Sequence, residues 1–276
     1  MAVKIDNHWN ARPQSGLQDA DAVYELVVEA GLTRFIALFH DNDTDYLGPM
    51  RSGRPTDPTL LKPLGATFTI SGAQDWVAAR IVGAGVPLIG EVRPATFRIS
   101  SRRAPHNLYV DTTKLRDYAE VRGYASEPPP YLFKWGEAVP GETGAASITM
   151  RFSAETKALW EWDGEQYSRS TNGDVHEWID REGETGPVTA DTLIVLFAQR
   201  YTASPPSGSG SSVPAMETVG TGRTLAFFDG GVTEGTWARD SIDEMFLLSD
   251  ADGIEMTIPP GKPWISLVPD TGSVTW

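Results

Sequence analysis

Hydrophobic residues in the first half of the chain follow two different periods. Three short apolar runs, rich in β-branched and aromatic side chains, are typical of buried or half-buried strands. They cover residues 2–6, 23–28 and 33–39. Three other segments have helical spacing, and Asp111 is a suitable N-cap for the last of them. They cover residues 59–64, 73–82 and 112–121. Strands and helices together predict an α+β domain of mixed layers.

Apolar segments in the second half are short and closely spaced. Eight strand-like segments are separated by turn dipeptides such as Asn172-Gly173 and Asp229-Gly230, which are typical of tight hairpins. The segments cover residues 146–153, 158–162, 166–170, 191–198, 224–228, 245–248, 254–258 and 264–268. This pattern predicts a mainly antiparallel β domain, either a sandwich or barrel-like. The Ser-, Gly- and Pro-rich stretch 203–212 has the composition of a loop between two strands.

A proline run separates the two halves. The segment from Ser126 to Pro130 ends in three consecutive prolines, and proline is excluded from helix interiors and central strands. We therefore predict an α+β domain over residues 1–128 and a linker over 129–146. An acidic all-β domain is expected over residues 147–276.

Charge also differs between the halves. The chain has 276 residues, with 23 Lys and Arg against 37 Asp and Glu, a net charge of −14. Residues 1–128 hold 14 basic and 15 acidic side chains, whereas 129–276 hold 9 and 22. So acidic a balance argues against a nucleic-acid or anionic-membrane partner. The chain has no cysteine, which excludes disulfides and thiolate chemistry. No apolar stretch approaches the roughly 20 residues of a membrane-spanning helix.

Polar motifs in the first half gather in loops and at strand ends, where a rigid scaffold usually presents functional residues. The candidate ligand-binding residues are Asn7, Arg12, Gln14, Arg34, Arg51, Arg54, His106 and Asn107. Guanidinium groups bind carboxylate or phosphate through paired hydrogen bonds. The leading hypothesis is therefore a pocket for a polar or anionic ligand.

Two glutamates leave alternatives open. Glu25 and Glu29 lie inside otherwise apolar segments, where a carboxylate needs a partner. One interpretation is a structural network in which Arg34, Arg51 and Arg54 neutralise both. Another is a glycan or peptidoglycan hydrolase with Glu25 or Glu29 as acid or base and His106 assisting, although His106 equally fits an ordinary loop histidine. A third is a structural or partner-docking scaffold that uses the acidic β domain.

No cofactor is expected, with one calcium motif as a weak alternative. Asp41, Asp43 and Asp45 alternate as the first ligands of a calcium loop do. Tyr46 stands where such a loop needs glycine, and Ser52 where it needs a bidentate glutamate. A solvated hairpin tip is the favoured interpretation.

Several motifs, in order along the chain, resemble the YerB-like family of bacterial envelope lipoproteins. In the first half they are residues 2–8, 11–17, 20–25, 31–35, 48–54 and 104–109, and in the second 167–169, 220–222, 229–230, 235–237 and 260–265. The match covers nearly the whole chain and includes Arg12-Pro13-Gln14-Ser15-Gly16-Leu17 and Pro260-Gly261-Lys262-Pro263-Trp264. The stretches 41–45 and 203–212 look longer than the turns usual in that family.

The resemblance implies two domains and a family with no assigned biochemical role. It also implies export and lipid anchoring outside the cytoplasmic membrane, with Met1 in place of a removed signal and anchor. We therefore expect an extracellular, cell-envelope-associated protein whose ligand is a glycan, a peptidoglycan fragment or a peptide carboxylate.

Overall fold

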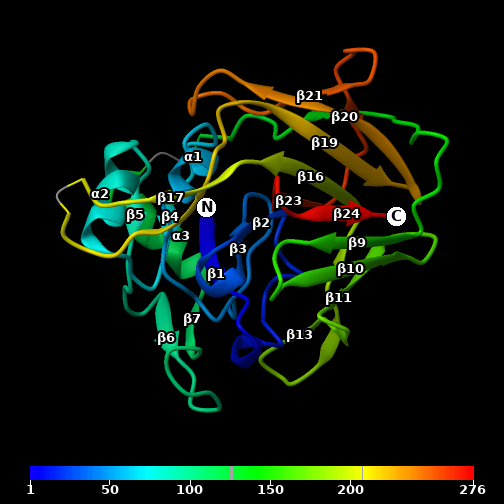
Figure 1. The fold of residues 1–276 in the computed structure, drawn as a ribbon. Helices are drawn as coiled ribbons and strands as arrows, with labels where there is room; N and C mark the ends of the chain where they lie inside the picture. Colours follow the sequence, from blue (N-terminus) through cyan, green and yellow to red (C-terminus); the bar gives the residue numbers. More distant parts are fainter. Residues whose placement is uncertain (125–126, 207) are drawn as a thin grey trace.

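A ten-stranded sheet runs through the computed structural model, which describes residues 1–124, 127–206 and 208–276 (Figure 1). The strand order is β21-β20-β19-β16-β23-β2-β3-β1-β4-β5. The strands are β1 (Ala2–Asp6), β2 (Ala22–Val27), β3 (Thr33–Leu38), β4 (Phe68–Thr69), β5 (Leu88–Ile89), β16 (Thr192–Ala198), β19 (Gly220–Phe228), β20 (Gly231–Arg239), β21 (Leu247–Asp250) and β23 (Pro263–Pro269).

Strands from both halves of the chain meet inside this sheet. β23 pairs in parallel with β2 on one side and with β16 on the other. Ser266 lies opposite Glu25 in this register, and Ile265 lies opposite Tyr24. A hydrogen-bonded ladder therefore joins the two halves, which the sequence pattern did not indicate.

A second, smaller sheet packs against one face of the large sheet. Its order is β12-β11-β10-β9-β24, with β15 also paired to β11. The strands are β9 (Ser147–Arg151), β10 (Lys157–Trp162), β11 (Tyr167–Thr171), β12 (Asp174–Val175), β15 (Thr189–Ala190) and β24 (Ser273–Thr275). Trp160 and Tyr167 of this sheet share one buried cluster with Phe227 and Trp264 of the large sheet. The predicted β domain is thus a sandwich of two sheets, one of which the first half shares.

Helices and short strand pairs complete the fold. The helices are α1 (Asp57–Leu61), α2 (Asp75–Gly83) and α3 (Thr112–Val121), with 3-10 turns η1 (Trp9–Ala11) and η2 (Glu29–Gly31). The short pairs are β6 (Thr96–Arg98) with β7 (Leu108–Val110), β8 (Lys134–Trp135) with β22 (Thr257–Ile258), β13 (Glu177–Ile179) with β14 (Thr185–Pro187), and β17 (Arg200–Ala203) with β18 (Val213–Met216). The Asp111 side chain accepts a hydrogen bond from the Lys114 N–H, which confirms the predicted N-cap.

Most local predictions are confirmed. The α+β class with a mainly antiparallel β half is the observed fold. Asn172-Gly173 joins β11 to β12 and Asp229-Gly230 joins β19 to β20, and all four residues have the positive φ that such turns need. The stretch 203–212 connects β17 to β18, although its Ser207 lies outside the described residues. Ser126, at the predicted domain boundary, also lies outside them.

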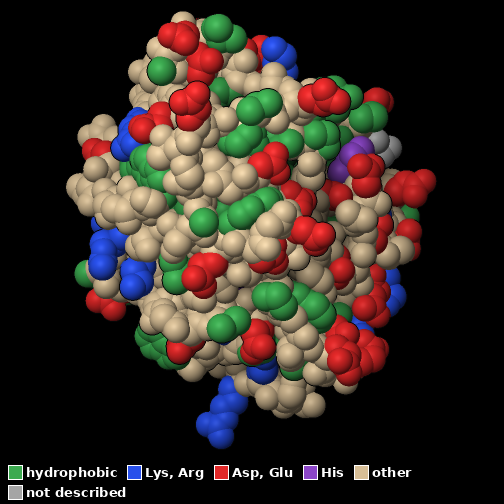
Figure 2. All heavy atoms as spheres, turned by 90° about the vertical axis from the view of Figure 1, so that its right-hand side faces the viewer, with side chains coloured by type: hydrophobic (Ala, Val, Ile, Leu, Met, Phe, Trp, Pro, Cys, Tyr) green, Lys and Arg blue, Asp and Glu red, His purple; other side chains and the backbone are tan. Residues whose placement is uncertain are grey.

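Acidic side chains dominate the face of the molecule seen in Figure 2, where few basic groups appear. This agrees with the excess of 22 acidic over 9 basic residues in the second half. Within the described part of the chain, the helices are too short or too polar to span a bilayer.

Candidate functional site

The large sheet divides the predicted site residues between its two faces. Side chains alternate along a strand, so Arg34 and Phe35 of β3 point to opposite sides. In register, Asp6 lies opposite Arg34 and Glu25 lies opposite Phe35. Asp6 and Arg34 therefore share the face that also carries α1 and α2, whereas Glu25 faces the second sheet.

On the first face, a hollow of about 280 Å³ opens beside the ends of β1 and β3. Its polar lining comes from Asp6, His8, Glu29, Thr33, Arg34, Arg51 and Arg54. We call this set, with the cavity it encloses, the arginine hollow. Three guanidinium groups face two carboxylates there, which leaves an excess of one positive charge in a chain whose net charge is −14.

Arg34 is the most unusual of these groups. It is only 8% exposed, and its Nη1 donates to the Ser52 carbonyl at 2.8 Å. Among the residues that the structure describes, none pairs a carboxylate with Arg34, and its buried Nε has no hydrogen-bond partner. Burial, followed by the nearby charge of Arg54, lowers the pKa of Arg34 to about 10, so the group stays protonated at neutral pH.

Arg54 and Glu29 form the outer wall. Arg54 Nε donates to Glu29 Oε2 at 2.7 Å, and its Nη1 donates to the Gly53 and Ser52 carbonyls. Burial opposes ionisation of Glu29, but the hydrogen bond and charge of Arg54 outweigh it and hold the pKa of Glu29 below its usual range. Glu29 is therefore a carboxylate already engaged by an arginine.

Asp6 organises the opposite wall. Its Oδ2 lies 2.8 Å from His106 Nδ1 and 3.2 Å from Arg51 Nε, the latter without the alignment of a hydrogen bond. The ring of His8 stacks on that of His106 with centroids 4.8 Å apart. His106 does not itself line the hollow but contacts two residues that do, Asp6 and His8.

A buried ion pair supports the hollow from below. Lys4 Nζ lies 2.6 Å from Asp57 Oδ1, and both side chains have no exposed surface. The other oxygen of Asp57 accepts a hydrogen bond from the Arg54 backbone N–H at 2.6 Å. Burial lowers the pKa of Lys4 to about 8. This pair fixes α1 and the loop of Arg51 and Arg54 against β1.

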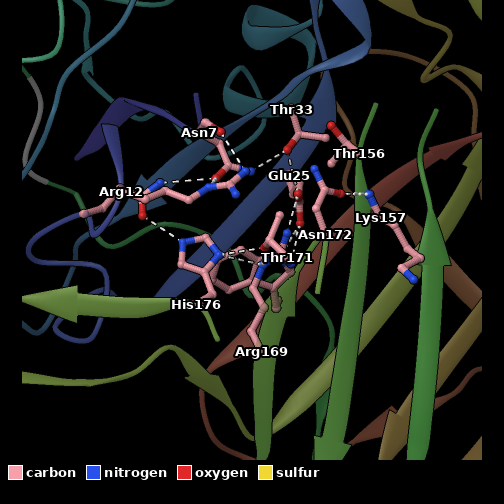
Figure 3. Close-up of polar contacts among 12 residues, drawn as sticks. Asn7, Arg12, Glu25, Thr33, Thr156, Lys157, Arg169, Thr171, Asn172 and His176 are labelled. Carbon is pink, nitrogen blue, oxygen red and sulfur yellow. Dashed lines mark hydrogen bonds and ion pairs between the residues drawn. The ribbon is translucent and has the colours of Figure 1, made fainter. Parts of the chain in front are cut away.

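On the second face, Glu25 belongs to a sealed polar network (Figure 3). Arg169 of β11 donates to both Glu25 oxygens at 2.8 Å, and neither side chain is exposed. Thr33 and Trp264 donate to the same carboxylate at 2.8 and 2.9 Å. The Arg169 guanidinium also lies 5.1 Å from the ring centre of Trp160. Glu25 is thus fully satisfied where the two sheets meet.

The network continues to the amino-terminal loops. Arg169 Nε donates to His176 Nδ1 at 3.1 Å, so the proton of the neutral imidazole sits on Nε2, which lies 2.7 Å from Gln14 Oε1. Gln14 Nε2 in turn donates to Asn7 Oδ1, which also accepts from Arg12 Nε. Burial first, and then the charge of Arg169, hold the pKa of His176 well below its ordinary range.

The predicted ligand-binding set therefore separates into three groups. Arg34, Arg51 and Arg54 line the arginine hollow, and His106 adjoins it through Asp6 and His8. Asn7, Arg12 and Gln14 belong to the sealed network. Asn107 accepts from the exposed Arg98 at 2.9 Å and donates to the Ile99 carbonyl. Asp6, which stands in the motif 2–8, bridges His106 and Arg51.

The acidic tip at residues 41–45 spreads its carboxylates over separate partners. Asp43 pairs with Arg116 at 2.8 Å, Asp45 with Arg181 at 3.2 Å, and Asp41 is the most exposed of the three. In the described ranges, no group of three or more His, Cys, Asp or Glu side chains is placed to hold a metal ion.

A larger hollow, of about 860 Å³, lies beside Met1 and residues 127–135. Its titratable lining is mainly acidic, with Asp21, Asp41, Glu120 and Glu127 against Arg116, His40 and the Met1 amino group. This composition does not favour an anion, and the predicted site residues lie elsewhere. The arginine hollow is therefore the stronger candidate.

Two family models match the chain. Residues 1–125 match "Protein of unknown function (DUF3048) N-terminal domain", and residues 148–265 match "Protein of unknown function (DUF3048) C-terminal domain". The matched ranges fall on either side of the predicted linker.

A relative and a solved structure agree with these models. The chain is 28% identical to "Putative lipoprotein YerB" of Bacillus subtilis (strain 168), over 98% of this chain and 81% of that protein. The crystal structure of the YerB protein from Bacillus subtilis superimposes with a TM-score of 0.83 at 26% identity. The superposition covers all of this chain and 93% of the YerB chain.

Proposed function

The chain belongs to the two-domain DUF3048 family of YerB-like proteins, and from this premise we propose that it binds an anionic ligand in the arginine hollow. The ligand carries a carboxylate or phosphate group, which enters between Arg34, Arg51 and Arg54. No covalent step is part of this proposal.

One observation carries it. Arg34 is buried, charged and without an ion-pair partner, and the Nε atoms of Arg34 and Arg51 are both buried with no hydrogen-bond partner among the described residues. Leaving a buried charged donor unpaired costs several kcal/mol, roughly 1–3 for the hydrogen bond alone. A ligand anion bound in the hollow would supply the missing counter-charge beside Arg34.

The family supports a proposal for where the anion comes from. The Bacillus subtilis relative is named a lipoprotein, which supports a place at the cell envelope. A lipid-anchored protein there would meet glycans, peptidoglycan fragments and peptide carboxylates. These remain the ligand classes that we propose.

The hydrolase hypothesis gains little from the geometry. A glycosidase needs two carboxyl groups about 5–10 Å apart across an open cleft. Glu25 has no exposed surface and is held by Arg169, while Glu29 is engaged by Arg54. Neutralised carboxylates favour binding or scaffolding over acid–base catalysis.

Calorimetric titration tests the proposal. Wild-type protein should bind inorganic phosphate or a small carboxylate such as succinate, and Arg34→Gln should weaken that binding about tenfold or more, because a charge-assisted hydrogen bond is lost. Arg51→Ala should act in the same direction.

Arg98→Ala is the matched control. Arg98 is an exposed arginine that pairs with Glu91, outside the hollow, so its removal should leave affinity unchanged. Melting temperatures of all variants separate lost binding from lost folding. Equal affinity of the wild type and a folded Arg34→Gln variant would refute the proposal, as would the absence of any anion binding.

A further inference from the structure

An exposed tryptophan stands at the rim of the arginine hollow. Trp9 is 64% exposed, although it is one of the largest apolar side chains in the chain. Its ring centre lies 3.7 Å from that of His8, whose side chain lines the hollow. His8 therefore lies between the exposed indole and the arginine hollow.

The turn that carries Trp9 is anchored on both sides of this residue. Trp9 opens η1, where His8 Nδ1 accepts a hydrogen bond from the Asn10 N–H at 3.1 Å. Ala11, at the other end of the turn, is fully buried. The His8 ring also stacks on His106, which Asp6 fixes. The indole thus contacts the His8 ring at a tilt of 35°, while much of its surface stays in solvent.

We infer that the arginine hollow and Trp9 together bind a pyranose that carries a carboxylate. The carboxylate pairs with Arg34 and Arg51, and the apolar face of the sugar ring stacks on the indole of Trp9. This inference rests on the proposed function and adds the class of ligand.

The chemistry of the rim fits such a ligand. A flat aromatic face suits the C–H side of a sugar ring, since aromatic side chains combine a large apolar surface with defined stacking geometry. Because Nδ1 of His8 accepts a hydrogen bond, the neutral ring carries its proton on Nε2, a donor for a hydroxyl group. A simple anion would use only the arginines, whereas an acidic sugar would use arginines, imidazole and indole.

Two kinds of acidic sugar have this chemistry, and calorimetry with a defined probe for each distinguishes them. One probe is glucuronic acid, with its carboxylate on the ring, and the other is N-acetylmuramic acid, with its carboxylate on a lactyl ether. At least one should bind wild-type protein more tightly than succinate does. The methyl ester of glucuronic acid should bind much more weakly, because it lacks the charge.

Trp9→Ala should weaken binding of the acidic sugar about two- to tenfold and leave succinate binding unchanged. Trp9→Phe should recover part of the loss. Tyr131→Ala is the matched control, because Tyr131 is an exposed aromatic residue that does not line the arginine hollow.

Each outcome separates this inference from the proposed function. If both acidic sugars bind no better than succinate, or if Trp9→Ala leaves their affinity unchanged, the sugar class is wrong while the anion site stands. If neither succinate nor the acidic sugars bind wild-type protein, both proposals fail.

Discussion

Two glutamate–arginine pairs near the same strands have different physical roles. Glu25 and Arg169 form a bidentate pair with no exposed surface, whereas Glu29 is 41% exposed beside Arg54. Removing one partner of a buried ion pair is costly, because the other charge stays buried without a counter-charge. The intact pair nevertheless adds little net stability relative to an apolar pair of similar size. The first pair fixes how the two sheets meet, and the second borders a hollow that solvent can enter.

Glu25→Gln should destabilise the protein strongly. The neutral amide leaves the Arg169 charge buried without a counter-charge, and such a change costs roughly 3–5 kcal/mol. Urea unfolding at pH 7 measures the loss. Glu234→Gln is the control, since Glu234 forms an exposed pair with Arg223 and should change stability by about 1 kcal/mol or less. A loss as small as that of the control would contradict the assigned role of Glu25.

Sequence reasoning found the need for a partner at Glu25 but not the partner itself. A carboxylate in an apolar strand demands a cation, and Arg34, Arg51 and Arg54 were the natural choices nearby. Arg34 lies on the other face of the sheet. Glu25 pairs with Phe35 across β2 and β3, and the side chain of Arg34, the next residue in β3, points away from that of Phe35. The true partner, Arg169, is 144 positions away, and no local pattern encodes that distance.

At the scale of elements, local patterns predicted most helices and hairpins. Capping at Asp111 and the Asn-Gly and Asp-Gly turns act within a few residues, so a short window is enough to detect them. Strand β20 was missed. It contains Gly231 and Gly235, and glycine lowers strand propensity. Gly235 is needed because a Cβ there would lie 1.9 Å from the Ser249 carbonyl oxygen of the neighbouring strand.

Contacts between elements also predict that the stability of the fold depends on pH. His176 joins the β12–β13 segment to the loop of Gln14, and it is buried in neutral form. Its folded-state pKa is depressed, so the unfolded chain binds a proton that the folded chain does not. Stability contributed by this group is therefore present above about pH 6.5 and is lost as pH falls below that value.

Thermal unfolding between pH 7.5 and 5.5 measures this effect. The melting temperature of wild-type protein should fall across this window. His176→Asn should be less stable at pH 7.5 but should show a flatter pH profile, because the titrating group is gone. An equally steep profile in the variant would assign the dependence to other groups, such as His8, whose pKa burial also lowers.

At the scale of the molecule, the two halves of the chain are joined more closely than composition indicates. The proline run at 128–130 and the change in charge predict two domains, and two family models match on either side. Yet β2 and β23 pair in parallel inside one sheet. Their residues are about 240 positions apart, and hydrophobic periodicity carries no information on pairing over such separations.

Pairing between β1 and β3 builds the candidate site. Asp6 and Arg34 lie side by side because β1 and β3 are antiparallel neighbours. Arg51 reaches them because its backbone N–H donates a hydrogen bond to the Lys4 carbonyl. The sequence indicated which residue types would matter. It could not indicate that Asn7, Arg12 and Gln14 would join the network of Glu25 and His176 instead of lining the arginine hollow.

The central claim is that an anion enters the arginine hollow and becomes the partner of Arg34. Crystals soaked in selenate, a tetrahedral dianion, test it most directly through anomalous diffraction. We predict a selenium peak within about 4 Å of the Arg34 guanidinium, close to Arg51, that is absent from Arg34→Gln crystals treated alike. An empty hollow, with selenate bound only to exposed lysines and arginines, would contradict the account.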